Sequence, residues 1–407
     1  MYNAVYQMRK QIIIPILIIL FLLVGTALVI LFGKGYTLNL NGNGPVLSGT
    51  GLLVATSAPD GAQVLINGHL TTATDNTINL APGDYDIKIF KEGYFPWEKK
   101  ITIKKEVVSK ADALLFPTAP QLISITNVGI LNPVLDPTQT KLAYTVASQS
   151  AAKNGIYVLD MSLRPILTLQ NASTQLADDT IVGFSQSVLI WSPDSAQILA
   201  TVPTPSATTY LLQTSGMNQT PQDVTETIAS VNTSWQKIKT EKDTAQMNSL
   251  PKKLRLVAAT NFNILEWSTD DTKILYEASE SASIPLIVTP ALIGTDSTPQ
   301  VRDIKKGEVY VYDIKEDRNY PILSSLPTTN NNQQLPIMWY PDSKHLVYVH
   351  DGKIDMMEYD AANPTTVYAG PFMNDYVFPW PDATKLVILT NLGNPSITPN
   401  LYTIGLK

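Results

Sequence analysis

The chain has 407 residues, of which 44% are hydrophobic and 16% are charged, and its formal net charge is −6. This length and composition predict a folded protein of two or three domains and exclude an intrinsically disordered chain. The acidic balance argues against a general nucleic-acid binder, which normally presents a basic surface. The chain has no cysteine, which excludes disulfides, thiolate chemistry, cysteine-ligated zinc and a lipid anchor on cysteine.

The N-terminal segment predicts a membrane anchor. Residues 12–32 carry no charge, and at ~1.5 Å rise per residue a helix of this length matches a hydrocarbon core. Arg9 and Lys10 precede the run, so we expect residues 1–11 to be a cytoplasmic tail, 12–32 an uncleaved signal anchor and 34–407 extracytoplasmic. A cleaved signal peptide and a buried core helix are the alternatives. The run is longer than a typical signal h-region, and a helix apolar on every face does not suit a mostly β domain.

Residues 33–50 are rich in Gly and Asn and predict a linker. The next segment, 51–116, shows closely spaced strand and turn signals. Asn67-Gly68 is a strong hairpin signal. The predicted strands are 52–57, 62–66, 77–80, 85–90, 99–103 and 107–115. Six short strands at this density are typical of a small β-sandwich.

Three motifs in this segment resemble the PEGA domain. They are PDGAQVLING at 59–68, LAPGDY at 80–85 and KEGY at 91–94. PEGA members typically read P-x-G-A-x-V-x-I-(D/N)-G, then L-x-P-G-x-Y/H, then K-x-G-Y, and the namesake Pro-Glu-Gly-Ala is Pro-Asp-Gly-Ala here. The resemblance implies a non-catalytic extracytoplasmic module of envelope proteins, often next to a membrane anchor. The family has no agreed ligand, so no site residues carry over.

A second pattern recurs through the rest of the chain. Three clear copies read IWSPDSAQILA at 190–200, EWSTDDTKILY at 266–276 and MWYPDSKHLVY at 338–348, and weaker copies cover 135–144 and 378–388. Each copy predicts the end of one strand, a Pro-Asp turn and a new strand. A Tyr-containing strand usually follows, at 155–160, 209–213, 308–313, 355–359 and 400–404.

This pattern resembles the TolB-type, WD40-like propeller repeat, which reads W-S-P-D-G-x-x-I-A-Y. The usual Gly after Asp is replaced here by Ser195, Asp271, Ser343 or Ala383. The resemblance implies a β-propeller over residues 120–407 with five to seven blades, of which six is the preferred number. The copies are unevenly spaced, and some gaps exceed the ~40–45 residues of one blade, so we expect insertions or a blade with a drifted turn.

Residues 220–259 break the β pattern and predict a helical insertion. One apolar stripe on a helix is formed by Val224, Ile228, Val231, Trp235 and Ile238. Either this stripe packs on the propeller itself, or it is a docking surface for a partner. We expect the helix to begin at Thr220, which can cap it, with Pro221 in the first turn. A second helix is predicted after Pro251, with Leu254 and Val257 facing inward.

Few residues indicate chemistry. His69, His345 and His350 show no metal-ligand spacing, and we expect them at the surface or at strand ends. The G-x-S-x-G elbow and the Walker and Rossmann glycine patterns are absent. We therefore predict no catalytic, cofactor-binding or metal-binding residue and no cofactor.

The repeated turns contain a set of carboxylates, namely Asp194, Asp270, Asp342 and Asp382. They should lie one per blade around a ring, so we predict a structural role for them. Trp191, Trp267, Trp339 and Trp380 are likewise predicted to pack between blades.

The sequence thus favours a non-enzymatic binding or scaffolding protein of the cell envelope, anchored by one helix, with a protein or cell-wall glycan partner and no nucleic acid. One alternative is a propeller-type lyase or glycosidase acting on envelope polysaccharide, which requires acidic side chains that converge in the central funnel. Another is a sensor coupled through the helical insertion, which requires an exposed apolar stripe. The oligomeric state is left open.

Overall fold

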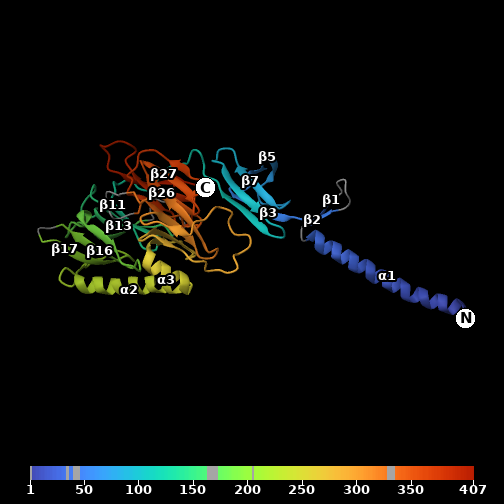
Figure 1. Ribbon diagram of the computed structural model, residues 1–407. Coiled ribbons are helices and arrows are strands. Elements are labelled where there is room, and N and C mark those ends of the chain that lie inside the picture. Colours follow the sequence, from blue (N-terminus) through green and yellow to red (C-terminus); the bar gives the residue numbers. More distant parts are fainter. Residues whose placement is uncertain (1, 34–35, 40–45, 163–172, 204–205, 328–334) are drawn as a thin grey trace. The chain divides into compact units, whose positions relative to one another are not determined.

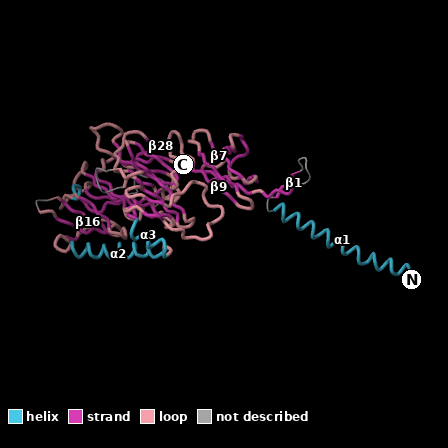
Figure 2. The backbone as a smooth tube through the Cα atoms, viewed as in Figure 1, coloured by secondary structure: helices cyan, strands magenta, loops and turns pink. Residues whose placement is uncertain are grey.

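The structure is a computed structural model that describes residues 2–33, 36–39, 46–162, 173–203, 206–327 and 335–407. It is mostly β, as Figure 2 shows by the predominance of strands. The chain divides into two compact units, which are described separately. Unit 1 comprises Met1–Glu92, Pro96–Leu115 and Ala291–Thr298, and unit 2 comprises Gly93–Phe95, Phe116–Pro290 and Pro299–Lys407.

The N-terminal helix α1 runs from Tyr2 to Gly33, so it begins before the predicted anchor at 12–32. The side chains of its residues 2–14 lie outside the described part of the structure. Among the residues that the structure describes, none of the helices is long and apolar enough to cross a membrane.

The segment predicted as a linker contains a two-stranded sheet. Strand β1 (Tyr36–Asn39) pairs antiparallel with β2 (Val46–Gly49). Residues 34–35 and 40–45 of that segment lie outside the described residues. The segment predicted as a linker is therefore partly regular structure.

A β-sandwich follows (Figure 1). Its strands are β3 (Gly51–Ala58), β4 (Gln63–Ile66), β5 (His69–Ala73), β6 (Asn76–Leu80), β7 (Gly83–Phe90), β8 (Trp97–Ile103) and β9 (Val108–Leu114). One sheet has the order β6-β3-β9 and the other β5-β4-β7-β8. Period-2 alternation buries one face of β3, β8 and β9, and Leu53 and Ile89 are fully buried.

The prediction of six strands is wrong by one, because β5 was not recognised. Its sequence, HLTTA, has no apolar alternation, and almost all of its residues are exposed. The hairpin signal before it is confirmed, since Asn67 (φ 49°) and Gly68 (φ 79°) both have the positive φ that a type I′ turn requires.

Unit 2 contains five four-stranded antiparallel sheets, which are the blades of a β-propeller. Blade one is β11 (Leu131–Leu135), β12 (Lys141–Val146), β13 (Gly155–Asp160) and β14 (Ser173–Asp178). Blade two follows the short 3-10 helix η2 (Phe184–Gln186) and is β15 (Val188–Trp191), β16 (Gln197–Val202), β17 (Thr208–Gln213) and β18 (Gln222–Asp223). Blade three is β19 (Phe262–Trp267), β20 (Lys273–Ala278), β23 (Val309–Asp313) and β24 (Arg318–Leu323).

Blade four is β25 (Ile337–Trp339), β26 (His345–His350), β27 (Lys353–Glu358) and β28 (Thr365–Tyr368). Blade five is β29 (Val377–Pro379), β30 (Lys385–Thr390), β31 (Asn400–Gly405) and β10 (Leu122–Ser124). Strand β10 comes from the start of the propeller and pairs with the last strand of the chain, Leu122 opposite Ile404. This pairing closes the ring.

The described residues therefore form five blades, and the preference for six is wrong. The long gaps hold other structure. The helices α2 (Ile228–Ser249) and α3 (Lys252–Asn261) lie between blades two and three. Blade three contains an excursion with the short strands β21 (Ala282–Ser283) and β22 (Asp303–Ile304).

The repeated turn has the same geometry in all five blades. The residue after the turn has a left-handed φ between 53° and 59° at Gln139, Ser195, Asp271, Ser343 and Ala383. At each of these positions the backbone N–H donates to the carbonyl oxygen three residues earlier. Such a φ favours Gly, the residue that the repeat normally has here. The prediction that the five sequence copies are equivalent is confirmed.

Neighbouring blades share apolar clusters. Blades five and one meet where Trp380 and Val387 pack with Leu142 and others. Trp191 belongs to the cluster of blades one and two, and Trp339 to that of blades three and four. The first strands β11 and β15, and β19 and β25, contact one another, as the innermost strands of neighbouring propeller blades do.

The helical insertion bridges blades two and three. Trp235 of α2 packs with Leu199 of blade two, and its indole donates to Gln197 Oε1 at 3.4 Å. Further along α2, the Gln246 amide donates to Asp271 Oδ1 of blade three at 2.8 Å. Leu254 of α3 is buried in the core of blade three, as predicted, and Val257 packs against that core.

The predicted helix start at Thr220 is wrong. Residues 222–223 form β18, and the helix begins at Ile228 because the chain first completes the fourth strand of blade two. The stripe is mostly turned inward. Val224 (2% exposed) and Trp235 (8%) are buried, Ile228 and Val231 pack against them, and Ile238 is exposed. The exposed stripe that the docking and sensor hypotheses require is therefore not present at Val224 and Trp235.

Candidate functional site at the ring centre

One carboxylate stands out at the centre of the ring. Glu266 lies on β19, the first strand of blade three, and the β19–β20 pairing shifts register between Ile264 and Glu266. Such a β-bulge changes the direction of the side chains that follow it and is common next to functional sites. Leu265, the extra residue, packs into the cluster shared with blade four.

The Glu266 carboxylate joins three blades. The Gln139 amide, in the turn after β11 of blade one, donates to Oε1. The backbone N–H of Trp339, at the end of β25 in blade four, donates to Oε2 at 2.8 Å. The indole of Trp339 also donates to the carbonyl oxygen of Glu266 at 3.3 Å. Both carboxylate oxygens thus serve as acceptors in a network that links blades one, three and four.

Burial raises the pKa of Glu266 to about 7, although the hydrogen bonds from Trp339 N–H and Gln139 oppose the shift. The residue as a whole keeps partial surface accessibility, whereas protein surrounds its carboxyl group, and the surroundings of the carboxyl group set its pKa. Titration near neutral pH is common among functional carboxylates, but it also occurs in structural networks. The Glu266 carboxyl group can therefore gain or lose a proton in a network whose other members, the Gln139 amide and the Trp339 N–H, are neutral.

The four predicted turn aspartates lie one per blade and cap their own turns. Asp194 accepts from Ser192 Oγ at 2.6 Å, and Asp270 accepts from Ser268 Oγ at 2.8 Å. The Ser192 hydrogen bond lowers the pKa of Asp194. Asp342 and Asp382 accept backbone N–H bonds from Lys344 at 2.8 Å and from Thr384 at 3.0 Å. These contacts give each carboxylate a local structural partner.

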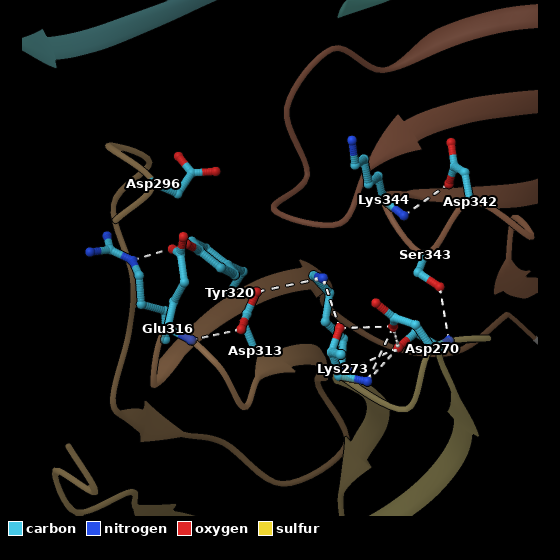
Figure 3. Close-up of polar contacts among 12 residues, drawn as sticks. Asp270, Lys273, Asp296, Asp313, Glu316, Tyr320, Asp342, Ser343 and Lys344 are labelled. Carbon is cyan, nitrogen blue, oxygen red and sulfur yellow. Dashed lines mark hydrogen bonds and ion pairs between the residues drawn. The ribbon is translucent and has the colours of Figure 1, made fainter. Parts of the chain in front are cut away.

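Figure 3 shows how further charged groups of blades three and four lie. Lys273 Nζ lies 3.7 Å from Asp313 Oδ2, and both side chains are at most 10% exposed. Asp313 also accepts the backbone N–H of Glu316 at 2.8 Å. The backbone N–H of Asp270 donates to Ser343 Oγ at 3.1 Å, which links the turns of the two blades (Figure 3). The ion pair thus lies within blade three, and the hydrogen bond to Ser343 joins blades three and four.

The histidines have structural partners too. His345 begins β26 and His350 ends it, so both lie at strand ends as expected. His345 is only 5% exposed, and its Nδ1 lies 2.7 Å from Asp342 Oδ2. His350 Nε2 lies 2.8 Å from Asp355 Oδ2. Within the described ranges, no group of three or more His, Cys, Asp or Glu could hold a metal ion.

The sequence analysis did not single out Glu266 or Gln139. A signal for Glu266 was present, because it occupies the position before the repeat tryptophan. The other four copies have Val134, Ile190, Met338 and Phe378 there. A carboxylate in an otherwise apolar repeat position marks a site that packing alone does not explain. Gln139 could not be paired with it, because the contact joins residues 127 positions apart.

Comparison with known proteins identifies the first module. Residues 50–118 match the family model of the PEGA domain, so this segment is a PEGA domain. A search of curated proteins finds no match to the chain.

Among solved structures, the chain is similar to a putative TolB from Agrobacterium tumefaciens, with 13% identity, 68% of this chain and 72% of that chain covered, and a TM-score of 0.20. TolB from Acinetobacter baumannii has 13% identity and a TM-score of 0.18, with 79% of this chain covered. This chain covers 60% of the length of that TolB. An oligogalacturonate lyase in complex with manganese has 12% identity, 81% and 80% coverage, and a TM-score of 0.21. At these TM-scores the likeness carries no argument about function.

Proposed function

We propose that this chain is a membrane-anchored extracytoplasmic protein of the cell envelope that binds or scaffolds a partner and performs no catalysis. The observation that carries the proposal is the order of its modules. A PEGA domain lies between an apolar N-terminal helix and a closed five-bladed propeller. The anchor confines the protein to the membrane surface, and the propeller presents strands and loops to the partner.

The anchor is supported by the chemistry of α1. Its large apolar side chains between Ile16 and Ile30 are exposed, and residues 12–32 carry no charge. An exposed apolar surface of this extent is unfavourable in water and favourable in lipid. Arg9 and Lys10 favour a cytoplasmic N-terminus.

Binding rather than catalysis is supported by the way the carboxylates are used. The turn aspartates accept hydrogen bonds from their own turns, and Glu266 accepts from Gln139 and Trp339. Hydrolysis or elimination by paired carboxylates needs two acids that face one bond. Glu266 has an amide, not a second acid, as its side-chain partner in this network.

A protein partner is favoured by exposed apolar groups on blade two. Val188 (51% exposed) and Ile190 (54%) lie on β15, the first strand of that blade, and Ile181 (90%) lies in the segment before it. Aliphatic side chains contribute to protein interfaces, whereas sugars are usually held by aromatic rings and polar groups.

Topology is tested by cysteine labelling, because the chain has no cysteine. Single variants Gln7→Cys and Ile181→Cys of the full chain are treated in intact cells with a membrane-impermeant maleimide. We expect labelling of Ile181→Cys only, and labelling of Gln7→Cys only after lysis. Equal protection of both positions in intact cells would show that the propeller is not extracytoplasmic.

Partner binding is tested with the paired substitution Val188→Ser and Ile190→Ser. We expect at least a tenfold loss of affinity for a partner isolated from envelope extract. The matched control is Ile397→Ser, which removes an exposed apolar side chain elsewhere on the propeller. Equal loss in the control, or none in the paired variant, would contradict the assignment to blade two.

A further inference from the structure

The PEGA domain of this chain is extended by a segment that lies far away in the sequence. Ala291–Thr298 belongs to unit 1, although it is encoded within the excursion of blade three, between β21 and β22. The family match ends at residue 118, so this segment is an addition to the module that the family defines.

The segment lies against an edge of the sandwich. Strand β8 is the last strand of the sheet β5-β4-β7-β8, and β7 pairs with only one side of it. The backbone N–H of Thr102 on β8 donates to Ser297 Oγ at 3.0 Å. A hydroxyl of the segment thus satisfies a main-chain donor that a neighbouring strand would otherwise satisfy.

A largely buried ion pair fixes the same segment. Lys99 Nζ on β8 lies 2.9 Å from Asp296 Oδ2, and both side chains are only 12% exposed. Burial opposes ionisation of Asp296, but the Lys99 charge and the hydrogen bonds of Thr298 and Lys99 lower its pKa. Charge-assisted hydrogen bonds of this kind are shorter and stronger than neutral ones.

The backbone of the segment also lies close to the sandwich at Gly294. Gly294 has φ +81°, and a Cβ there would lie 2.8 Å from Val107 Cγ1. By contrast, Leu292 (45% exposed) and Ile293 (75%) remain exposed. Polar contacts and close packing hold the segment, and its large apolar side chains are not buried. Replacement of this segment by a similar peptide would therefore expose little apolar surface to water.

We propose that the outer edge of β8 is a docking surface for a polypeptide segment that carries an acidic residue followed by a hydroxyl residue, and that residues 291–298 occupy this surface in cis. The Asp296-Ser297 pair supplies the two recognised groups, the carboxylate for Lys99 and the hydroxyl for the Thr102 N–H. The inference concerns unit 1 and does not depend on which partner the propeller binds.

The test uses the full chain with the double substitution Asp296→Asn and Ser297→Ala. Amide hydrogen exchange is followed at Thr102, and binding of a fluorescent peptide with the sequence of residues 289–300 is measured in trans. We expect exchange at Thr102 to rise at least tenfold. We also expect the variant to bind the peptide at least tenfold more tightly than the wild type, in which the tethered segment competes at a high effective concentration.

Three controls keep the outcome interpretable. Asp303→Asn changes an exposed acidic residue of the same excursion, and it should leave both measurements unchanged. Exchange in β23 should stay as slow as in the wild type, which shows that the double variant folds. A peptide with both substitutions should not bind.

Unchanged exchange at Thr102, or equal binding of the two peptides, would overturn the proposal. A doubled mass of the wild type in light scattering, lost in the double variant, would show that a second copy supplies the segment and would overturn occupation in cis.

Discussion

Trp191 donates its indole N–H to the carbonyl oxygen of Val134 at 3.0 Å, from blade two to the first strand of blade one. In the same way, the indole N–H of Trp339 in blade four donates to the carbonyl oxygen of Glu266 in blade three, at 3.3 Å. The repeat tryptophan therefore does more than fill space. It satisfies a main-chain acceptor of the preceding blade at the ring centre, where each unpaired carbonyl is unfavourable.

Trp191→Phe should lower the free energy of unfolding by about 2 kcal/mol, because it removes the hydrogen bond to Val134 and part of the packing between blades one and two. Thermal melting of the full chain measures the effect. Trp267→Phe is the matched control at the same position of blade three, where the side chain is only half-buried, and its effect should be smaller. An equal effect of both substitutions would contradict the role of the hydrogen bond.

Ser195→Gly should stabilise the protein by about 1 kcal/mol. Ser195 has φ 59°, which Gly adopts without strain, and its hydroxyl is buried without a partner in the structure. Ser195→Ala separates the two causes, since it removes the hydroxyl and keeps the Cβ. We expect a smaller gain in melting temperature for Ala than for Gly. A loss of stability with Gly would show that the turn does not need the left-handed backbone.

Glu266→Gln should remove a pH dependence of stability. The pKa of Glu266 in the folded protein is about 7, against the ordinary value of 4.5 for a glutamate carboxyl group. The folded state therefore holds a proton that the unfolded state has released, and stability falls as the pH rises through this window. The fall amounts to about 3 kcal/mol at ~1.4 kcal/mol per pKa unit.

Melting curves of wild type and Glu266→Gln between pH 4.5 and 7.5 measure this contribution as a difference, so that contributions from other groups cancel. The wild type should lose more stability than the variant as the pH rises. Parallel pH profiles would refute the raised pKa of the ring-centre carboxylate.

Trp235→Ala should destabilise the propeller by about 3 kcal/mol, because the side chain is buried between α2 and blade two. Ile238→Ala, on the same helix but exposed, should change stability by less than about 0.5 kcal/mol. Chemical denaturation of both variants gives the comparison. If Trp235→Ala left stability unchanged, the stripe would not have the packing role that the structure gives it.

Much of the fold could be predicted from local patterns. The repeat marks the turn between the first two strands of every blade, because the Asp cap and the left-handed corner are specified within a few residues. Blade number could not be predicted, because the helices α2 and α3 and the excursion at 279–308 lengthen the gaps as a sixth blade would. Strand β5 was missed because its exposed Thr-rich sequence has no alternation.

The site was harder to predict than the fold. Glu266 could be noticed as a carboxylate in an apolar repeat position, but its partners come from two other blades. The contact of Asp296 with Lys99 joins segments 197 residues apart and carries no repeat signal. The turn aspartates were predicted to be structural because their chemistry is local to the turn.

The central claim is that the propeller is a closed ring of five blades, and closure depends on the pairing of β10 with β31. Ser124 faces Tyr402 in that pairing, at a separation that suits a disulfide, whereas Lys385 lies on β30, one strand further away.

In this cysteine-free chain, the pair Ser124→Cys with Tyr402→Cys should form a disulfide under mild oxidation and raise the melting temperature. The pair Ser124→Cys with Lys385→Cys should remain reduced. Failure of the first pair to cross-link, or equal cross-linking of both, would contradict a ring closed by its first and last strands.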